Sequence, residues 1–232
     1  MSISLIPIEG IGEIKAGDVL SEIIVAAAPD LREGDVLVVT QKIVSKAEGR
    51  MVKVDANDPL SHKQVVEAES VRIVRRRGDL IISETAHGFV CANAGIDLSN
   101  VEKGWAALLP LDSDRSARRI RDGICARAGV SVGVIVSDTF GRPWRDGLTD
   151  VAIGCAGIAA IVDLRGTEDS LGRELQVTKV CIADEIASAA ELVMGKATGV
   201  PVAIVRGVDP EWLREGSVAE EIIRSPADDL FR

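Results

Sequence analysis

The sequence predicts an α+β (mixed α/β) fold in which mixed sheets carry flanking helices. Short β-branched runs alternate with amphipathic helical patterns, but without the regular strand–helix–strand spacing of a doubly wound sheet. Apolar residues make up 47% of the 232 residues and aromatic residues only 3%, so the core must consist mainly of Val, Ile, Leu and Ala. No composition shift marks a boundary, so we expect a single domain over residues 1–232, with an internal division near residues 75–115 as the alternative.

The first part of the chain predicts a strand, a helix and a second strand. Residues 5–8 form a short apolar strand, and Asp18 is in position to cap a helix that Pro29 ends. Residues 36–39 are all Val or Leu. Such a continuous apolar run is typical of a strand buried on both faces.

The next part predicts one helix followed by a strand pair. Apolar residues are available for one face of residues 59–76, which we interpret as a helix. Its last residues, Arg75 to Arg77, would then be solvated and complement the negative end of the helix dipole. Residues 80–82 and 89–91 predict two strands that pair around the turn His87-Gly88.

The second half of the chain contains the clearest helical patterns. Residues 114–128 predict a helix that ends at Gly129, and residues 132–136 predict an apolar strand. The Gly- and Ala-rich apolar stretch at residues 151–162 is compatible with either a helix or a strand. The last expected elements are a helix and a strand, at residues 182–194 and 202–205.

Charge and composition exclude several classes of protein. The formal net charge of −9 and the pI of about 4.9 argue against a broad surface for nucleic acid or for an anionic membrane. No apolar run reaches the roughly 18 residues that a membrane span needs, and the N-terminus lacks a basic region followed by an apolar stretch. The four cysteines form no CxxC pair, so we expect reduced core cysteines in a cytoplasmic protein.

Common nucleotide-binding and metal-binding motifs are absent from the sequence. Gly195-Lys196 is not part of a P-loop, because Ala190 replaces the first glycine and Ala197 replaces the Ser or Thr. Gly10-Ile11-Gly12 follows a strand, but Lys15 stands where the dinucleotide fingerprint needs glycine. We therefore predict neither a P-loop fold nor a Rossmann fold. With only two histidines, the chain cannot build a metal centre from several of them.

The strongest candidate for a binding segment is the predicted loop at residues 137–147. Asp138 and Thr139 stand at the end of an apolar strand, where a carboxylate followed by a hydroxyl can ligate a hard cation. Three further side chains suit an anionic, flat ligand: Arg142, Trp144 and Arg145. The alternative is a solvated loop with an Asx turn, but it does not explain a Trp and two Arg in one loop of a chain with three Trp.

Three other segments carry weaker signals of the same kind. Asp97, in residues 93–100, could provide a second carboxylate to the same cation, and Lys46, in residues 40–50, could hold a phosphate as a point charge. Residues 194–201 follow a helix and could close over a ligand. Taken alone, each segment also has a purely structural interpretation, as a turn, a surface lysine or a helix C-cap.

Together and in this order, the four segments resemble the coenzyme F(420):L-glutamate ligase family, also called coenzyme F(420)-0:gamma-glutamyl ligase. The resemblance extends from Leu5 to Gly207 and is carried by four stretches: VVTQKIVSKAEGR, NAGIDLSNV, SDTFGRPWRDGLTDVAIG and VTKVCIADEIASAAELVMGKATGVPVAIVRG. It implies a ligase that uses GTP and Mg²⁺ or Mn²⁺, with K⁺ as a further candidate ion, to attach L-glutamate to the deazaflavin precursor coenzyme F(420)-0. It also implies an intertwined homodimer, and a chain without the additional C-terminal flavin-binding domain that some bacterial relatives carry.

The resemblance implies roles for individual residues. Asp97 and Asp138 match metal-ligand positions, and Thr139 matches a position at a second metal. Nucleotide contacts are implied for three single residues and two loops: Gln41, Lys46 and Asn100, then Ile11, Gly12, Glu13 and Ile14, and Met194, Gly195, Lys196, Ala197, Thr198, Gly199, Val200 and Pro201. Two of these positions depart from the family's pattern. Gln41 stands where relatives often have a small hydroxyl residue, and Lys196 where some have an acidic or carboxamide side chain near the second metal.

The chemistry of amide formation agrees with these residues. A carboxylate repels an amine and offers a poor leaving group, so phosphorylation to an acyl phosphate is needed to make it reactive. Phosphoryl transfer requires positioning and charge neutralisation rather than a protein nucleophile, which suits a chain with no evident catalytic triad. Two alternatives remain open. One is a ligase of the same chemistry for another carboxylate substrate, and the other is a non-catalytic nucleotide- or metal-binding module, against which the presence of both Asp97 and Asp138 argues.

Overall fold

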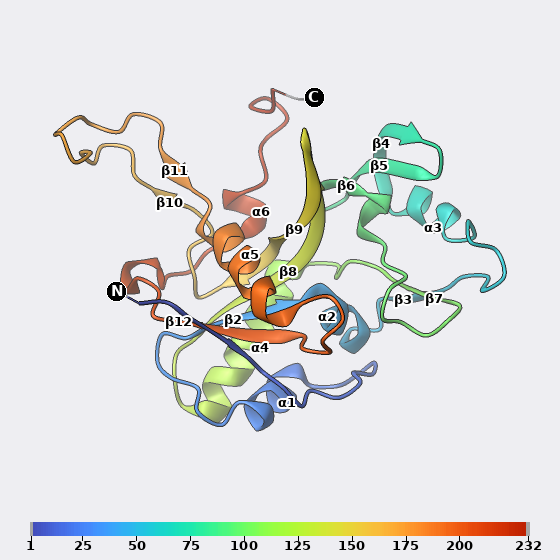
Figure 1. Cartoon of the computed structure of the whole chain (residues 1–232), viewed down its shortest axis with the longest axis horizontal. Coiled ribbons are helices and arrows are strands. Elements are labelled where there is room, and N and C mark those ends of the chain that lie inside the picture. The colour runs from blue at the N-terminus through green and yellow to red at the C-terminus, as the bar shows by residue number, and fades with distance from the viewer. Residues whose placement is uncertain (1, 231–232) are drawn as a thin grey trace.

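The computed structural model describes residues 2–230 and has the predicted α+β architecture, with several sheets and flanking helices (Figure 1). The largest sheet has five strands in the order β1-β12-β2-β8-β9. They are β1 (Ser4–Pro7), β12 (Val202–Arg206), β2 (Val36–Thr40), β8 (Gly133–Arg142) and β9 (Arg145–Ala156). Within this sheet β2 and β8 are parallel, and the other neighbouring strands are antiparallel.

Helices cover both faces of the central sheet. The helices α1 (Leu20–Ala27) and α4 (Ser113–Ala128) pack together on one face, and α5 (Ile182–Met194) lies on the other (Figure 1). The buried side chains between these layers are almost all aliphatic, as the composition predicts. The largest of them include Ile24, Leu37, Ile124, Ile135, Ile158 and Met194.

A second, smaller apolar cluster lies on the side of the molecule where the chain passes through residues 51–108. It contains Val66, Ile81, Ala94, Ile96, Ala106 and Leu108. Short elements surround it: β3 (Met51–Lys53), α3 (Lys63–Ala68), β4 (Ser70–Arg77), β5 (Leu80–Thr85), β6 (Val90–Ala92), the 3-10 helix η1 (Asn93–Gly95) and β7 (Trp105–Ala107). The strands pair as β4-β5-β6 and as β3-β7.

The remaining elements connect or extend these two parts. The helix α2 (Gln41–Ala47) follows β2 directly, and η2 (Pro210–Trp212) and α6 (Val218–Glu221) lie near the C-terminal end. The strands β10 (Val162–Asp163) and β11 (Lys179–Val180) form the base of a long arm that projects from the body (Figure 1). Within residues 2–230, none of the helices combines the length and the apolar character that crossing a membrane requires.

The expected helix over residues 59–76 is wrong. The helix α3 ends at Ala68, and residues 70–77 form β4, which pairs antiparallel with β5 across a turn at Gly78. The β-branched residues of this stretch favour an extended backbone once a partner strand is present. The basic run therefore lies on an edge strand rather than at a helix end, and Arg76 pairs with Glu67 at 2.6 Å.

The structure also corrects two smaller expectations and decides one that the sequence left open. Residues 137–147 are not a loop, because β8 continues to Arg142 and β9 begins at Arg145, so that the segment is the end of a long hairpin. The ambiguous stretch that begins at residue 151 is a strand as far as Ala156. Asp18 does not cap α1, since its carboxylate accepts a hydrogen bond from the backbone amide of Lys15 at 2.7 Å.

Asp114, in the first turn of α4, joins three elements through its carboxylate. Its Oδ1 accepts hydrogen bonds from the backbone amides of Cys155 in β9 (2.8 Å) and Val218 in α6 (3.0 Å). Its Oδ2 accepts from the hydroxyl of Ser217 (2.8 Å) and the backbone amide of Ala219 (3.1 Å). One side chain thus holds α4 and α6 against the strand that leads into the hairpin.

We expect Asp114→Ala to lower the free energy of unfolding by about 2–4 kcal/mol, because hydrogen bonds to a charged group contribute about 1.5–3 kcal/mol and several are lost together. Asp122→Ala is the matched control. Asp122 lies on the same helix with 61% of its side chain exposed and pairs with its neighbour Arg121, so a loss of about 1 kcal/mol or less is expected. Urea unfolding of both variants measures the difference, and equal losses would contradict the joining role.

Candidate active site

One cleft of about 1280 Å³ brings the predicted segments together. Residues from the N-terminal loop, α2, the segment 91–102, the β8–β9 hairpin and the loop after α5 line it. The predicted site residues among them are Ile11, Gly12, Glu13, Ile14, Gln41, Lys46, Asp97, Asn100, Asp138, Thr139, Gly195, Lys196, Ala197, Gly199, Val200 and Pro201. Segments that are far apart in the sequence therefore share one surface.

The parallel pairing of β2 with β8 explains why these segments meet. Thr40, the last residue of β2, lies opposite Ser137, so both strands lead to the same edge of the sheet. The chain enters α2 immediately after Thr40, whereas β8 continues with Asp138 and Thr139. The end of a buried strand thus places the basic helix α2 beside the acidic end of β8.

Asp97 is held by both its backbone and its side chain. Its amide and carbonyl pair with Ala107 at 3.0 and 2.9 Å, and its carboxylate accepts hydrogen bonds from the backbone amide of Ser99 and from Lys42 Nζ, both at 2.7 Å. Burial raises the pKa of this carboxyl, but the hydrogen bonds from Lys42 and Ser99 outweigh burial and hold the pKa below its usual range. Asp97 is therefore a carboxylate with a fixed orientation.

The environment of Asp138 disfavours the ionised form of its carboxyl group. Its Oδ1 accepts a hydrogen bond from the backbone amide of Thr139 at 2.8 Å. Desolvation raises the pKa of its carboxyl to about 7, with further contributions from the negative charges of Asp97 and Asp150, while the Thr139 amide and Lys196 oppose the rise. A cation at this point would relieve the repulsion between these carboxylates.

Asp97 and Asp138 fit a single divalent cation. Within residues 2–230, no group of three or more His, Cys, Asp or Glu side chains converges as a metal site would require, so the protein alone does not build a complete coordination sphere. Mg²⁺ is usually bound in such a setting, by one or two carboxylates together with waters and substrate phosphates. The donor set is thus suited to an ion that arrives with a phosphorylated substrate.

Asp150 is a central residue of the cleft that the sequence analysis did not identify. Its carboxylate is almost fully buried and accepts hydrogen bonds from Thr139 Oγ1 (2.6 Å), Ser137 Oγ (3.2 Å) and Lys196 Nζ (2.9 Å). The strand register places it opposite Thr139. A single acidic residue in the apolar run of β9 was the available signal, but its partners become visible only with the hairpin register.

The lysines of α2 were identified only in part. Lys46 contacts Glu13 Oε1 at 2.5 Å, and its side chain is 12% exposed whereas that of Glu13 is 71% exposed. Lys42, which the sequence analysis did not identify, contacts both Asp97 and the hydroxyl of Ser99 (2.8 Å). Since Lys42 and Lys46 are one helical turn apart, they share a face of α2 that is directed toward the cleft.

Two predicted nucleotide contacts have structural roles in the cleft wall. Gln41 is buried, and its Nε2 donates to Ser45 Oγ (2.6 Å) and to the carbonyl of Leu108 (2.8 Å), so both amide hydrogens are engaged. Asn100 has a positive φ of 52° and donates from Nδ2 to the carbonyl of Lys196 at 3.4 Å. Asn100 thereby connects two of the segments that line the cleft.

The cleft does not include every predicted site residue. Met194 is fully buried at the end of α5, and Thr198 Oγ1 donates a hydrogen bond to its carbonyl. This pair stabilises the loop at residues 195–201 but does not line the cleft. Arg142, Trp144 and Arg145 are exposed at the tip of the β8–β9 hairpin and do not line the cleft either. Their contact with a substrate stays a prediction.

The fold and the site together define an α+β protein whose large cleft combines carboxylates with lysines. Comparison with known proteins identifies its class: a model of the F(420)-0:Gamma-glutamyl ligase family matches residues 10–207. The chain belongs to this family of ligases.

Three archaeal relatives, each named coenzyme F(420):L-glutamate ligase, match the whole chain. The protein from Methanopyrus kandleri is 45% identical over all of this chain and 98% of its own length. Those from Methanothermobacter thermautotrophicus and Archaeoglobus fulgidus are 43% and 41% identical, also over all of this chain, and over 100% and 97% of their own lengths.

Proposed function

We propose that the protein is a GTP- and divalent-metal-dependent ligase that joins L-glutamate to coenzyme F(420)-0 through an amide bond (gamma-glutamyl ligase activity). The observation that carries the proposal is the cleft itself, which Asp97 and Asp138 line together with Lys42 and Lys46 of α2, and in which Lys42 pairs with Asp97. The names of the relatives support the two substrates of the amide bond, glutamate and the F(420) precursor.

The nucleotide would bind between α2, the loop 11–14 and the loop 195–201. Lys46 is the residue best placed to meet its phosphates, because its side chain lines the cleft, is largely buried and pairs with the exposed Glu13. An incoming phosphate would replace the exposed Glu13 carboxylate and form a charge-assisted contact. Glu13 in this structure thus occupies the position of an anionic ligand.

Asp97 and Asp138 would hold Mg²⁺ or Mn²⁺, with nucleotide phosphate and water completing the coordination. The ion would supply charge neutralisation at the transferring phosphoryl group. The raised pKa of Asp138 supports this assignment, since a carboxyl that is desolvated and lies near other carboxylates gains most from a cation. K⁺ is a further ion that this proposal includes, without a position assigned to it.

The reaction would proceed in two balanced steps. A carboxylate oxygen of the precursor attacks the γ-phosphorus of GTP, and the bond to the β-phosphate oxygen breaks to give an acyl phosphate and GDP. The glutamate nitrogen then attacks the acyl carbon, the carbon–oxygen bond to phosphate breaks, and the amine releases its proton to water. The hairpin tip, with Arg142, Trp144 and Arg145, would contact the anionic, aromatic precursor.

The direct test is mass spectrometry of the product formed from purified coenzyme F(420)-0, L-glutamate, GTP and Mg²⁺. We expect the precursor mass to increase by glutamate minus water, with GDP and phosphate formed in step. The enzyme could instead form GDP only when a different carboxylic acid replaces the precursor in the assay. That result would assign the same chemistry to a different substrate. Binding of GTP without any turnover would favour a non-catalytic module.

We expect Asp138→Asn to reduce kcat by at least about 100-fold, because metal-assisted charge neutralisation is worth several kcal/mol and each 1.4 kcal/mol is a factor of ten. Asp122→Asn, on the exposed face of α4, is the control and keeps its activity. Thermal melts establish that both variants are folded. Turnover by folded Asp138→Asn at the wild-type rate would rule out the metal-ligand role.

Lys46→Ala should raise the KM for GTP by about 10- to 150-fold, which corresponds to the roughly 1.5–3 kcal/mol of a charge-assisted contact, and should change the KM for glutamate far less. Lys46→Arg should restore only part of the loss, because a planar guanidinium does not replace a compact ammonium group. Lys179→Ala, on the exposed arm, is the control. If the KM for GTP is unchanged in Lys46→Ala, this residue does not contact the nucleotide.

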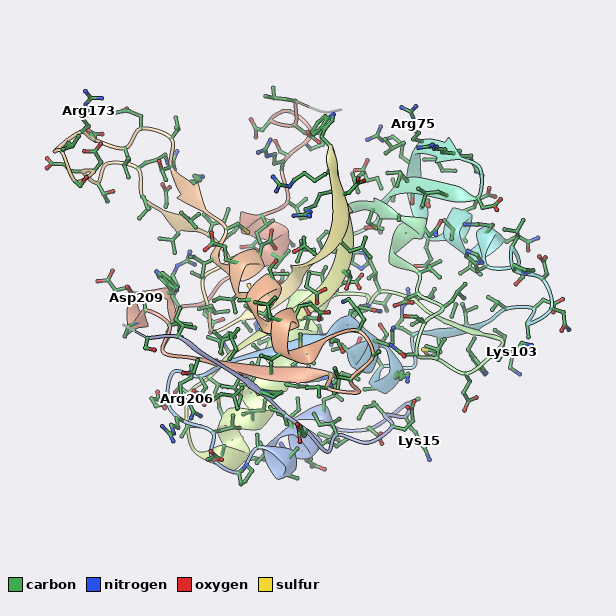
Figure 2. The ribbon with its side chains drawn as sticks, in the orientation of Figure 1. Lys15, Arg75, Lys103, Arg173, Arg206 and Asp209 are labelled. Carbon is green, nitrogen blue, oxygen red and sulfur yellow. The ribbon has the colours of Figure 1, made fainter. Side chains whose placement is uncertain are left out.

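We also propose a homodimer, supported by the arm between β10 and β11. The arm extends away from the body, with Arg173 at its far end (Figure 2), and exposes 84% of Leu171 and 86% of Val177. Light scattering should give the mass of two 24.6 kDa chains, and Leu171→Ser with Val177→Ser should shift the mass toward one chain. A wild-type mass of one chain at micromolar concentration would contradict the proposal.

A further inference from the structure

The Lys196 ammonium group lies within a set of oxygen atoms from three elements. Its Nζ is 2.9 Å from Asp150 Oδ1 and 3.1 Å from Glu191 Oε1, and it also donates to Thr139 Oγ1. These oxygens belong to β9, α5 and β8 respectively. The Asp150 and Glu191 side chains are 2% and 20% exposed, so the charges that Lys196 faces are largely withdrawn from water.

This set of donors is one that a divalent cation would also use. Hard cations such as Mg²⁺ and Mn²⁺ bind carboxylate and hydroxyl oxygens, and Thr139 is the residue expected beside a second metal ion. A divalent ion bound to Asp150 and Thr139 would lie in contact with the Lys196 ammonium group. The repulsion between them would cancel much of the gain from coordination. The residues present therefore do not fit a second metal ion.

We propose that the Lys196 ammonium group takes the place of a second divalent cation, so that the site uses one exchangeable metal ion and one built-in positive charge. The inference rests on the proposed function, because it assigns the single exchangeable ion to Asp97 and Asp138. Lys196 acts here as a positioning residue. It neutralises Asp150 and fixes the Thr139 hydroxyl beside the metal-binding carboxylate of Asp138.

The local charges around Asp138 agree with a single divalent ion. Six carboxylates and three lysines line the cleft, and four of these carboxylates interact with two of the lysines as one set. In this set Asp97 pairs with Lys42, Asp150 and Glu191 pair with Lys196, and Asp138 has no ammonium group at ion-pair distance among the described residues. The excess is two negative charges, which one divalent cation neutralises. Without the Lys196 charge the excess would be three, and the oxygens that Lys196 now holds would be available for a second ion.

The experiment counts protein-bound Mn²⁺ by equilibrium dialysis and metal analysis, with saturating GTP and without precursor or glutamate. We expect one Mn²⁺ per wild-type chain and one additional Mn²⁺ per chain in Lys196→Gln. Lys196→Arg, which keeps the positive charge, and Lys179→Gln, which removes a charge on the exposed arm, should both give the wild-type count. Thermal melts of Lys196→Gln should also show a greater rise with Mn²⁺ than those of the wild type.

The outcomes separate this inference from the proposed function. Equal counts in wild type and Lys196→Gln would overturn the inference, whatever the activity of either protein. Two Mn²⁺ per wild-type chain would also overturn it, even if the Lys196→Gln variant does not fold. A wild-type chain that binds no Mn²⁺, beside a Lys196→Gln chain that binds one, would contradict the metal site at Asp97 and Asp138 and support only the part of the inference in which Lys196 takes the place of a cation.

Discussion

The parallel register between β2 and β8 brings the start of α2 and the acidic end of β8 to the same side of the cleft. It extends from the pair Val36–Gly133 to the pair Thr40–Ser137, and both strands are buried over most of this length. Because the strands are parallel, their C-terminal ends lie at one edge of the sheet, where ligands are commonly bound in such sheets. A shift of one residue would reverse which side chains of β8 face the core and would remove Asp138 from α2.

The charged groups of the cleft are then compensated in pairs rather than by bulk solvent. Lys42 balances Asp97, Lys46 balances the exposed Glu13, and Lys196 balances Asp150. Buried carboxylates are costly unless they are paired, so Lys42 and Lys196 also stabilise the fold by pairing with Asp97 and Asp150. Asp138 lies near Lys196, but desolvation together with the charges of Asp97 and Asp150 raises the pKa of its carboxyl to about 7.

Most of the fold and much of the site could be predicted from local patterns. The helices α4 and α5 have unbroken apolar faces, and β2 and β12 are continuous apolar runs, so their positions agree with prediction. The failures concern long-range pairing. The residues of β4 are compatible with a helix or a strand, and the pairing with β5 determines that they form a strand. Asp150 was missed for the same reason, because only the hairpin register places it opposite Thr139.

Gln41 shapes the cleft through the hydrogen bonds of its side-chain amide. Its amide group and the hydroxyl of Ser45 both bind the carbonyl of Leu108, which belongs to the smaller apolar cluster. Arg50 Nε adds a hydrogen bond to the next carbonyl, that of Leu109, at 3.0 Å. Because α2 follows a strand of the main core, these bonds fix the smaller cluster, and Asp97 with it, relative to the central sheet. Gln41 therefore helps to fix the position of Asp97 relative to the central sheet.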